Sequence, residues 1–145
     1  MIRMKPRKRT SNSFGGNFER IGFTTLSLPD FLYFRNLFYK GKRKIVPANI
    51  DKLLTRLGLA IWFMDDGSYK SKACREKVIC THGFNIKEIE LLCFVLKEKF
   101  GLEAIPRKQV DGTEIYILAS LYNKLKKLIS PYLVSSFNYK LDSFS

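Results

Sequence analysis

Residues 57–67 read LGLAIWFMDDG, and this stretch decides the fold. An apolar run of this length that stops at a glycine predicts a largely buried helix over 57–66. The run ends in two adjacent carboxylates, Asp65 and Asp66, where the negative end of the helix dipole disfavours further negative charge. On charge alone, a solvated Asp-Asp-Gly turn is the commoner structure. Otherwise the pair needs a compensating cation, which would be a divalent metal, a lysine or an arginine.

The segments around this helix predict an α+β domain with a mixed or antiparallel sheet and helices on one face. Asn85 and Glu88 have the spacing of a capping box that begins a helix. Asp111 and Gly112 mark a tight turn between two strands. The expected strands are residues 18–26, 77–81, 104–108 and 114–118, and residues 68–76 are expected to be a polar loop. The expected helices are residues 29–40, 57–66, 85–101 and 120–130, with a further short helix after Pro47. Ser120 is expected to cap the last of these helices.

The charge of the chain points to a polyanionic partner. Its 26 Lys and Arg residues outweigh 13 Asp and Glu residues, which gives a formal net charge of +13. A folded domain this basic favours nucleic acid over a membrane surface as partner. No apolar run approaches the roughly 18–20 residues that a membrane-spanning helix needs.

The cysteines do not predict a disulfide or a metal site. Cys74, Cys80 and Cys93 are odd in number and form no CxxC motif, so the simplest environment is a reducing compartment. Cys80 and His82 are close in sequence, but two ligands do not complete a zinc site. We therefore interpret both as ordinary strand residues.

Residues 1–17 are expected to form a basic N-terminal arm. This segment is either a solvated, disordered tail or an arm that lies along phosphates and orders on binding. A second basic run follows the predicted helix at 29–40. The candidate nucleic-acid contacts in these two runs are Arg3, Lys5, Arg7, Lys8, Arg9, Lys42 and Arg43.

Five segments, in this order, resemble the double-motif branch of the LAGLIDADG homing endonucleases. They are IGFTTLSLPDFLYFRNLFY (21–39), KIVPANI (44–50), LGLAIWFMDDG (57–67), VICTHGFNIKEIELLCFVLKEKFGL (78–102) and ISPYLVSSFNYKL (129–141). The resemblance covers roughly residues 20–141. It implies that residues 18–56 are a remnant of the first repeat and its bridge, and that 57–145 are a LAGLIDADG-like domain. The first signature helix has no match upstream of residue 18.

The resemblance implies roles for individual residues. Asp66 matches the acidic residue that binds Mg²⁺ at the scissile phosphate, whereas Asp65 matches a position that is not usually essential. Lys44 and Lys140 match basic residues that orient water or steady phosphate charge near the active site. Arg107, Lys108 and Tyr116 lie on the hairpin that relatives place in the DNA major groove. His82 replaces a glutamine that is common in the family.

Three functions are compatible with these features. In the first, the domain is an RNA-binding structural factor, either an organellar ribosome component or an intron splicing factor, which has lost nuclease activity and needs no cofactor. In the second, it is a subunit of a split, Mg²⁺-dependent DNA endonuclease. In the third, it homodimerises through residues 57–67.

The missing first motif and the +13 charge favour the first function, and the retained Asp66, Lys44 and Lys140 favour the second. We expect the chain alone to be inactive as a nuclease. We also expect a protein or RNA surface to cover Leu59 to Phe63, no membrane partner, and a location in a mitochondrion or chloroplast.

Overall fold

The computed structural model describes residues 2–13, 16–26, 28–71 and 74–141. The chain divides into two compact units, Met1–Leu37 and Phe38–Ser145. The functional residues of the 57–67 segment lie in the second unit.

The first unit contains a long β-hairpin. Strand β1 (Ile2–Ser13) pairs antiparallel with β2 (Gly16–Thr25), and helix α1 (Pro29–Phe38) follows. Pro6 lies in a register shift between Met4 and Arg7, as expected for a residue without an N–H to donate to the ladder. Much of the basic segment, which we expected to be either a disordered tail or an arm that orders on binding, is therefore one strand of a hairpin.

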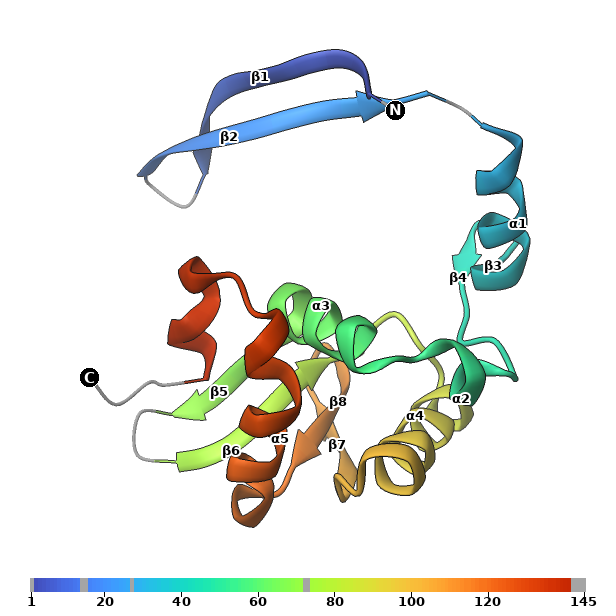
Figure 1. The fold of residues 1–145 in the computed structure, drawn as a ribbon, viewed down its shortest axis with the longest axis vertical. Helices are drawn as coiled ribbons and strands as arrows, with labels where there is room; N and C mark the ends of the chain where they lie inside the picture. The colour runs from blue at the N-terminus through green and yellow to red at the C-terminus, as the bar shows by residue number, and fades with distance from the viewer. Residues whose placement is uncertain (1, 14–15, 27, 72–73, 142–145) are drawn as a thin grey trace. The chain divides into compact units, whose positions relative to one another are not determined.

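The second unit is built on a four-stranded antiparallel sheet with the order β5-β6-β8-β7 (Figure 1). The sheet strands are β5 (Gly67–Ser71), β6 (Cys74–Cys80), β7 (Ala104–Gln109) and β8 (Gly112–Ile117). A small ladder, β3 (Tyr39–Lys40) and β4 (Arg43–Lys44), precedes it. The helices are α2 (Ile50–Leu53), α3 (Arg56–Asp66), α4 (Ile86–Phe100) and α5 (Tyr122–Ile129), with 3-10 turns η1 (Ala119–Leu121), η2 (Ser130–Tyr132) and η3 (Ser135–Lys140).

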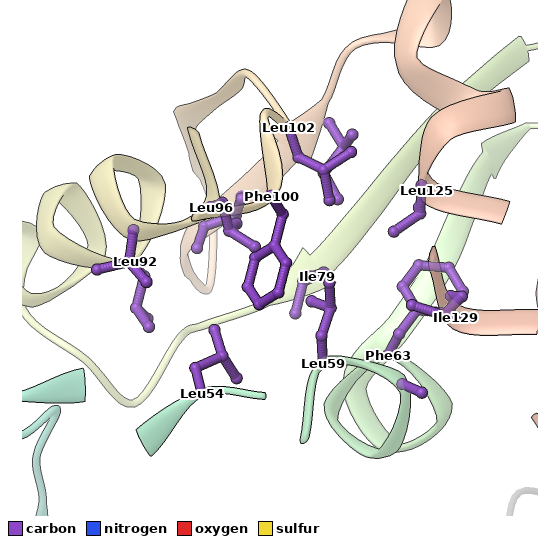
Figure 2. Packing of buried hydrophobic residues seen from close by; sticks show 14 of the residues in the cluster. Leu54, Leu59, Phe63, Ile79, Leu92, Leu96, Phe100, Leu102, Leu125 and Ile129 are labelled. Carbon is purple, nitrogen blue, oxygen red and sulfur yellow. The ribbon is translucent and has the colours of Figure 1, made fainter. Parts of the chain in front are cut away.

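The core lies between the helices and one face of this sheet. Ile79, Ile115 and Ile117 occupy alternate strand positions that point to the same face, and all three are fully buried. They pack with side chains from α3, α4 and α5, including Phe63, Leu96 and Leu125 and their neighbours (Figure 2). The α+β architecture predicted from the sequence is confirmed, and every strand pairing described is antiparallel.

Helix α4 begins and ends as its sequence predicts. The Asn85 side chain accepts a hydrogen bond from the Glu88 N–H, and the Glu88 carboxylate accepts one from the Asn85 N–H. Gly101 ends the helix with φ 60°, a left-handed conformation that favours glycine. The predicted capping box is confirmed.

Two expectations are wrong. Residues 67–71 form strand β5 rather than a polar loop, because the sheet needs a fourth strand and an edge strand tolerates polar side chains. Ser120 does not cap α5; it lies within η1, and Leu121 precedes the helix without a side-chain cap. Across the described ranges, every helix falls short of the length and apolarity needed to cross a bilayer.

Candidate functional site

Helix α3 presents one face to the core and another to solvent. The Thr55 hydroxyl caps its first turn by accepting a hydrogen bond from the Gly58 N–H at 3.0 Å. Leu59 and Phe63 are fully buried, so the expectation that this face lacks cover is wrong for both residues. The exposed apolar side chains are instead Leu57 (49% exposed) and Ile61 (54% exposed).

The C-terminal end of α3 runs directly into β5. Asp65 and Asp66 are both exposed and form the last residues of the helix, and Gly67 is the first residue of the strand. A side chain at Gly67 would collide with the carbonyl oxygen and ring of Phe63. The glycine therefore lets the strand leave the helix close to the core and fixes where Asp66 emerges.

Lys140 neutralises this helix end. Its Nζ donates hydrogen bonds to the carbonyl oxygens of Met64 at 2.6 Å and Asp65 at 3.0 Å. These carbonyls belong to the last turn, where an α-helix leaves its acceptors without intrahelical partners. Lys140, which lies on η3, thus places a positive charge on the backbone carbonyls of this helix end.

Lys44 shares a cavity with the two carboxylates. The cavity has a volume of about 350 Å³, and Lys44, Asp65 and Asp66 are the charged residues among those lining it. Apolar residues, including Val46, Trp62 and Leu92, form much of the rest. Asp66 and Lys44 therefore line one cavity, and Lys140 binds two carbonyl oxygens in the last turn of α3.

The donor set at this end fits part of a Mg²⁺ site. Carboxylate oxygens are the hard ligands that Mg²⁺ takes, and Asp66 offers two of them at an exposed position. Among the described residues, Asp66 belongs to no group of three Asp, Glu, His or Cys side chains that could together hold an ion. Asp66 can therefore supply one side of a metal site, and further ligands must come from elsewhere.

An ion-pair network covers the sheet face opposite the helices. Arg107 donates two hydrogen bonds to the Glu76 carboxylate, at 3.2 and 3.3 Å, and its guanidinium lies 4.4 Å from the ring centre of Tyr116. Lys70 also pairs with Glu76 at 3.4 Å. Burial alone would raise the pKa of the Glu76 carboxyl, but the hydrogen bonds from Arg107 and Lys70 outweigh it and hold that pKa below its ordinary value. The sequence did not identify Glu76, because its partners come from other strands.

Tyr116 lies beneath this network rather than on the surface. It is 5% exposed, its hydroxyl donates to the Glu114 carboxylate at 3.3 Å, and it accepts from Gln109 at 3.0 Å. Burial and the Glu114 carboxylate raise the pKa of the Tyr116 hydroxyl. This position does not favour the expected direct contact with a base, and the ring instead supports the Arg107 guanidinium.

The other candidate contact residues differ in whether their side chains are already paired within the protein. Arg43 is held by Glu88 through two hydrogen bonds of 2.9 and 3.1 Å. Lys8 lies 3.5 Å from Glu19, with both side chains highly exposed. Lys5, Arg7, Lys42 and Lys108 are exposed, whereas the side chains of Arg3 and Arg9 lie outside the described part of the structure.

Comparison with known proteins identifies relatives of this chain. The sequence profile of the LAGLIDADG DNA endonuclease family matches residues 2–128. The chain is 33% identical over 115 residues to the cytochrome b mRNA maturase bI2 of Saccharomyces cerevisiae, covering 77% of this chain and 26% of the maturase. It is 34% identical over 128 residues to the intron-encoded endonuclease ai4 of Dictyostelium discoideum, covering 86% of this chain and 79% of that protein.

The fold is also similar to that of a solved structure. The homing endonuclease I-WcaI, bound to its DNA recognition sequence, superposes with a TM-score of 0.87 and 27% sequence identity. The match covers 97% of this chain and 65% of I-WcaI, and the chain spans 53% of a second bI2 maturase, from Debaryomyces hansenii. The family profile, the curated relatives and the fold agree, and this chain belongs to the LAGLIDADG DNA endonuclease family.

Proposed function

We propose that this chain binds DNA and supplies one side of a Mg²⁺-dependent phosphodiester-cleaving site. The observation that carries the proposal is the cavity that Asp66, the last residue of α3, shares with Lys44. The helix dipole disfavours a second exposed carboxylate at this position, and a bound cation would offset that cost. A role in binding a cation would explain why this position carries a carboxylate.

The three side chains suit different parts of phosphodiester hydrolysis. The Asp66 carboxylate would hold Mg²⁺, which polarises the scissile phosphate and makes a bound water more acidic. Lys44, which lines the same cavity, would offset negative charge that develops on the phosphate. Lys140 is fixed by two helix carbonyls, so we assign it to positioning Asp66 and to offsetting local negative charge.

The proposal requires a second acidic helix end opposite Asp66. The exposed Leu57 and Ile61 side chains lie on α3 itself, where an apolar partner helix would bury them. Such a helix can come from an adjoining part of the same polypeptide or from another chain. The full activity belongs to that larger assembly.

RNA binding is the second candidate function. The sequence favoured it for the charge of the chain, and two similar relatives are named cytochrome b mRNA maturases. Those names support an intron splicing role more than a ribosomal one, and they suit the organellar location expected from the family resemblance. We place it second because RNA binding alone does not require the Asp66 carboxylate in a cavity with Lys44.

The nucleic acid that the protein contacts in its native source distinguishes the two functions. The protein would be crosslinked in cells and purified, and the bound DNA and RNA sequenced. The proposal predicts enrichment of one DNA site, with RNA no higher than in a mock purification. Stoichiometric enrichment of one intron or ribosomal RNA, without a DNA site, would contradict the DNA proposal and support the RNA function.

A further inference from the structure

Three side chains with metal-binding atoms meet on the sheet, away from the α3 site. Cys80 ends β6, His82 follows it, and Glu114 lies on β8, directly opposite Cys80 in the antiparallel register. The Cys80 Sγ, an imidazole nitrogen of His82 and a Glu114 carboxylate oxygen all lie within 4.8 Å of one another. The sequence placed Cys80 and His82 close together, but only the strand register adds the third ligand.

We propose that Cys80, His82 and Glu114 form a binding site for Zn²⁺ or a similar divalent transition-metal ion. An ion bound tetrahedrally at about 2.0–2.3 Å holds its ligand atoms roughly 3.3–3.8 Å apart. The His82 Nε2 and the Glu114 Oε1 are already 3.4 Å apart. The widest pair of ligand atoms would need to close by only about 1 Å to reach the distances of a zinc centre.

Neighbouring residues hold two of the three ligands in place. The Tyr116 hydroxyl donates to the Glu114 Oε2, and Gln109 in turn donates to Tyr116. The other carboxylate oxygen, Oε1, is therefore the one directed at His82. Gly112 packs so closely against His82 that an added Cβ would lie 2.9 Å from the His82 Cβ. Hydrogen-bonded support of this kind is typical of protein metal ligands.

The chemistry of this site separates it from the proposed Mg²⁺ site. A thiolate and an imidazole suit Zn²⁺ and similar ions, whereas Mg²⁺ takes oxygen ligands. On binding, the Cys80 thiol releases its proton, and the thiolate and the Glu114 carboxylate together balance the two positive charges of Zn²⁺. The ion would form a neutral cluster with these ligands and tie β6 to β8. This inference stands independently of the endonuclease proposal.

Metal titration of tag-free protein tests the site directly, because His82 is the only histidine in the chain. We expect one Zn²⁺ per chain in a competition titration with a chromogenic chelator. With Co²⁺ as the probe, we expect a thiolate-to-cobalt charge-transfer band and a shift of the single histidine signal in NMR spectra. Absence of saturable Zn²⁺ binding by the folded protein would overturn the proposal.

Matched variants assign the ligands. Loss of an outer hydrogen-bond partner typically weakens metal binding about 10–100-fold, so Cys80→Ser, His82→Ala and Glu114→Gln should each weaken Zn²⁺ binding by at least about 100-fold. The Tyr116→Phe variant should weaken it by about tenfold. Cys93→Ser is the control, because Cys93 lies on α4 outside the cluster and burial and Glu90 raise the pKa of its thiol to about 11.

The cobalt band provides a second readout, which reports on the thiolate ligand rather than on affinity. It should disappear in Cys80→Ser and persist in both Cys93→Ser and Asp66→Asn. If Cys80→Ser fails to fold, the shift of the single histidine signal when Co²⁺ is added to the wild-type protein still tests the site. A band that survives Cys80→Ser or is lost in Cys93→Ser would show that Cys80 is not the ligand.

Discussion

Gly67 is a residue whose lack of a side chain positions the candidate site. Its φ of −78° is accessible to any residue, so its role depends on space rather than on backbone conformation. A Cβ there would meet the Phe63 carbonyl and ring, and the neighbouring Asp66 would move with any relief of that clash. From the sequence we interpreted this glycine only as a signal that ends the helix. In the structure, the close packing of Phe63 against position 67 requires a residue without a side chain.

We predict that Gly67→Ala destabilises the protein by about 1–3 kcal/mol, the usual cost of overpacking a filled core. Chemical denaturation followed by tryptophan fluorescence measures this, because Trp62 lies on the same helix. Gly83→Ala is the control, since an added Cβ at Gly83 meets nothing within 4 Å and should change stability by less than about 0.5 kcal/mol. Equal stability of the two variants would show that Gly67 has more room than the structure allows.

Individual site residues differ in how well the sequence predicts them. The apolar run and its two carboxylates are a local signal, but only the family resemblance singled out Asp66 over Asp65 as a candidate. The partners on the open sheet face could not be identified from the sequence. Glu114 lies opposite Cys80 only through the register of β6 and β8, and Glu76 meets Arg107 only because the sheet order brings β6 and β7 to either side of β8. Sequence separation hides such pairs until the strand order is known.

At the scale of elements, α4 shows how a local signal fixes a boundary. Its capping box involves residues three positions apart, so the sequence alone predicts its start. Strand β5 is the opposite case, because it is held by pairing with β6 and carries no apolar alternation of its own. Its existence depends on the sheet, which is why the sequence suggested a loop.

Glu88 makes the stability of α4 dependent on pH. Burial would raise the pKa of its carboxyl, but hydrogen bonds from Arg43 and from the Asn85 N–H outweigh this and leave the folded-state pKa below the ordinary value of 4.5. A lowered carboxyl pKa stabilises the folded state fully above about pH 4.5, and this contribution is lost as the pH falls through the folded-state pKa.

We therefore predict that Glu88→Gln lowers the free energy of unfolding at pH 7 by about 0.5–1 kcal/mol and flattens its decline below pH 4.5. Glutamine retains an acceptor for the Asn85 N–H but loses the charge that pairs with Arg43. Urea denaturation at several pH values measures both effects, with Glu98→Gln, at an exposed position on the same helix, as the control. If the free energy of unfolding of Glu88→Gln depended on pH in the same way as that of the wild type, Glu88 would not be a source of the pH dependence.

At the scale of the whole molecule, positive charge is spread over both units. The first unit carries a basic strand where the sequence had suggested a disordered tail or an arm that orders on binding, and the second unit carries exposed lysines. A strand holds its charges at regular intervals, which suits contact with successive phosphates. Composition predicted the polyanionic partner, but composition does not reveal how the charges are arranged.

We predict that replacing five β1 residues with glutamine weakens DNA binding and reduces its dependence on salt. The residues are Arg3, Lys5, Arg7, Lys8 and Arg9. Each phosphate contact contributes about 0.9 to the slope of log K against log salt, so the slope should fall by several units and by no more than about 4.5. Fluorescence anisotropy at several salt concentrations measures the slope.

The control replaces Lys87, Lys124 and Lys127, which are exposed on α4 and α5. These helices contact the sheet on its core side, so the control should alter the slope less for each charge removed. Equal changes per charge in the two variants would mean that β1 makes no specific contribution.

Mg²⁺-dependent cleavage by the complete assembly, with Asp66→Asn compared against Asp65→Asn, tests the central claim most directly. The DNA site recovered from cells serves as the substrate, and binding is measured alongside cleavage. A metal ion contributes several kcal/mol to transition-state stabilisation, so Asp66→Asn should reduce cleavage more than about 100-fold while DNA affinity stays near that of the wild type. Asp65→Asn should retain most of the activity. Cleavage at the wild-type rate by Asp66→Asn would contradict the assignment of Asp66 to the metal site.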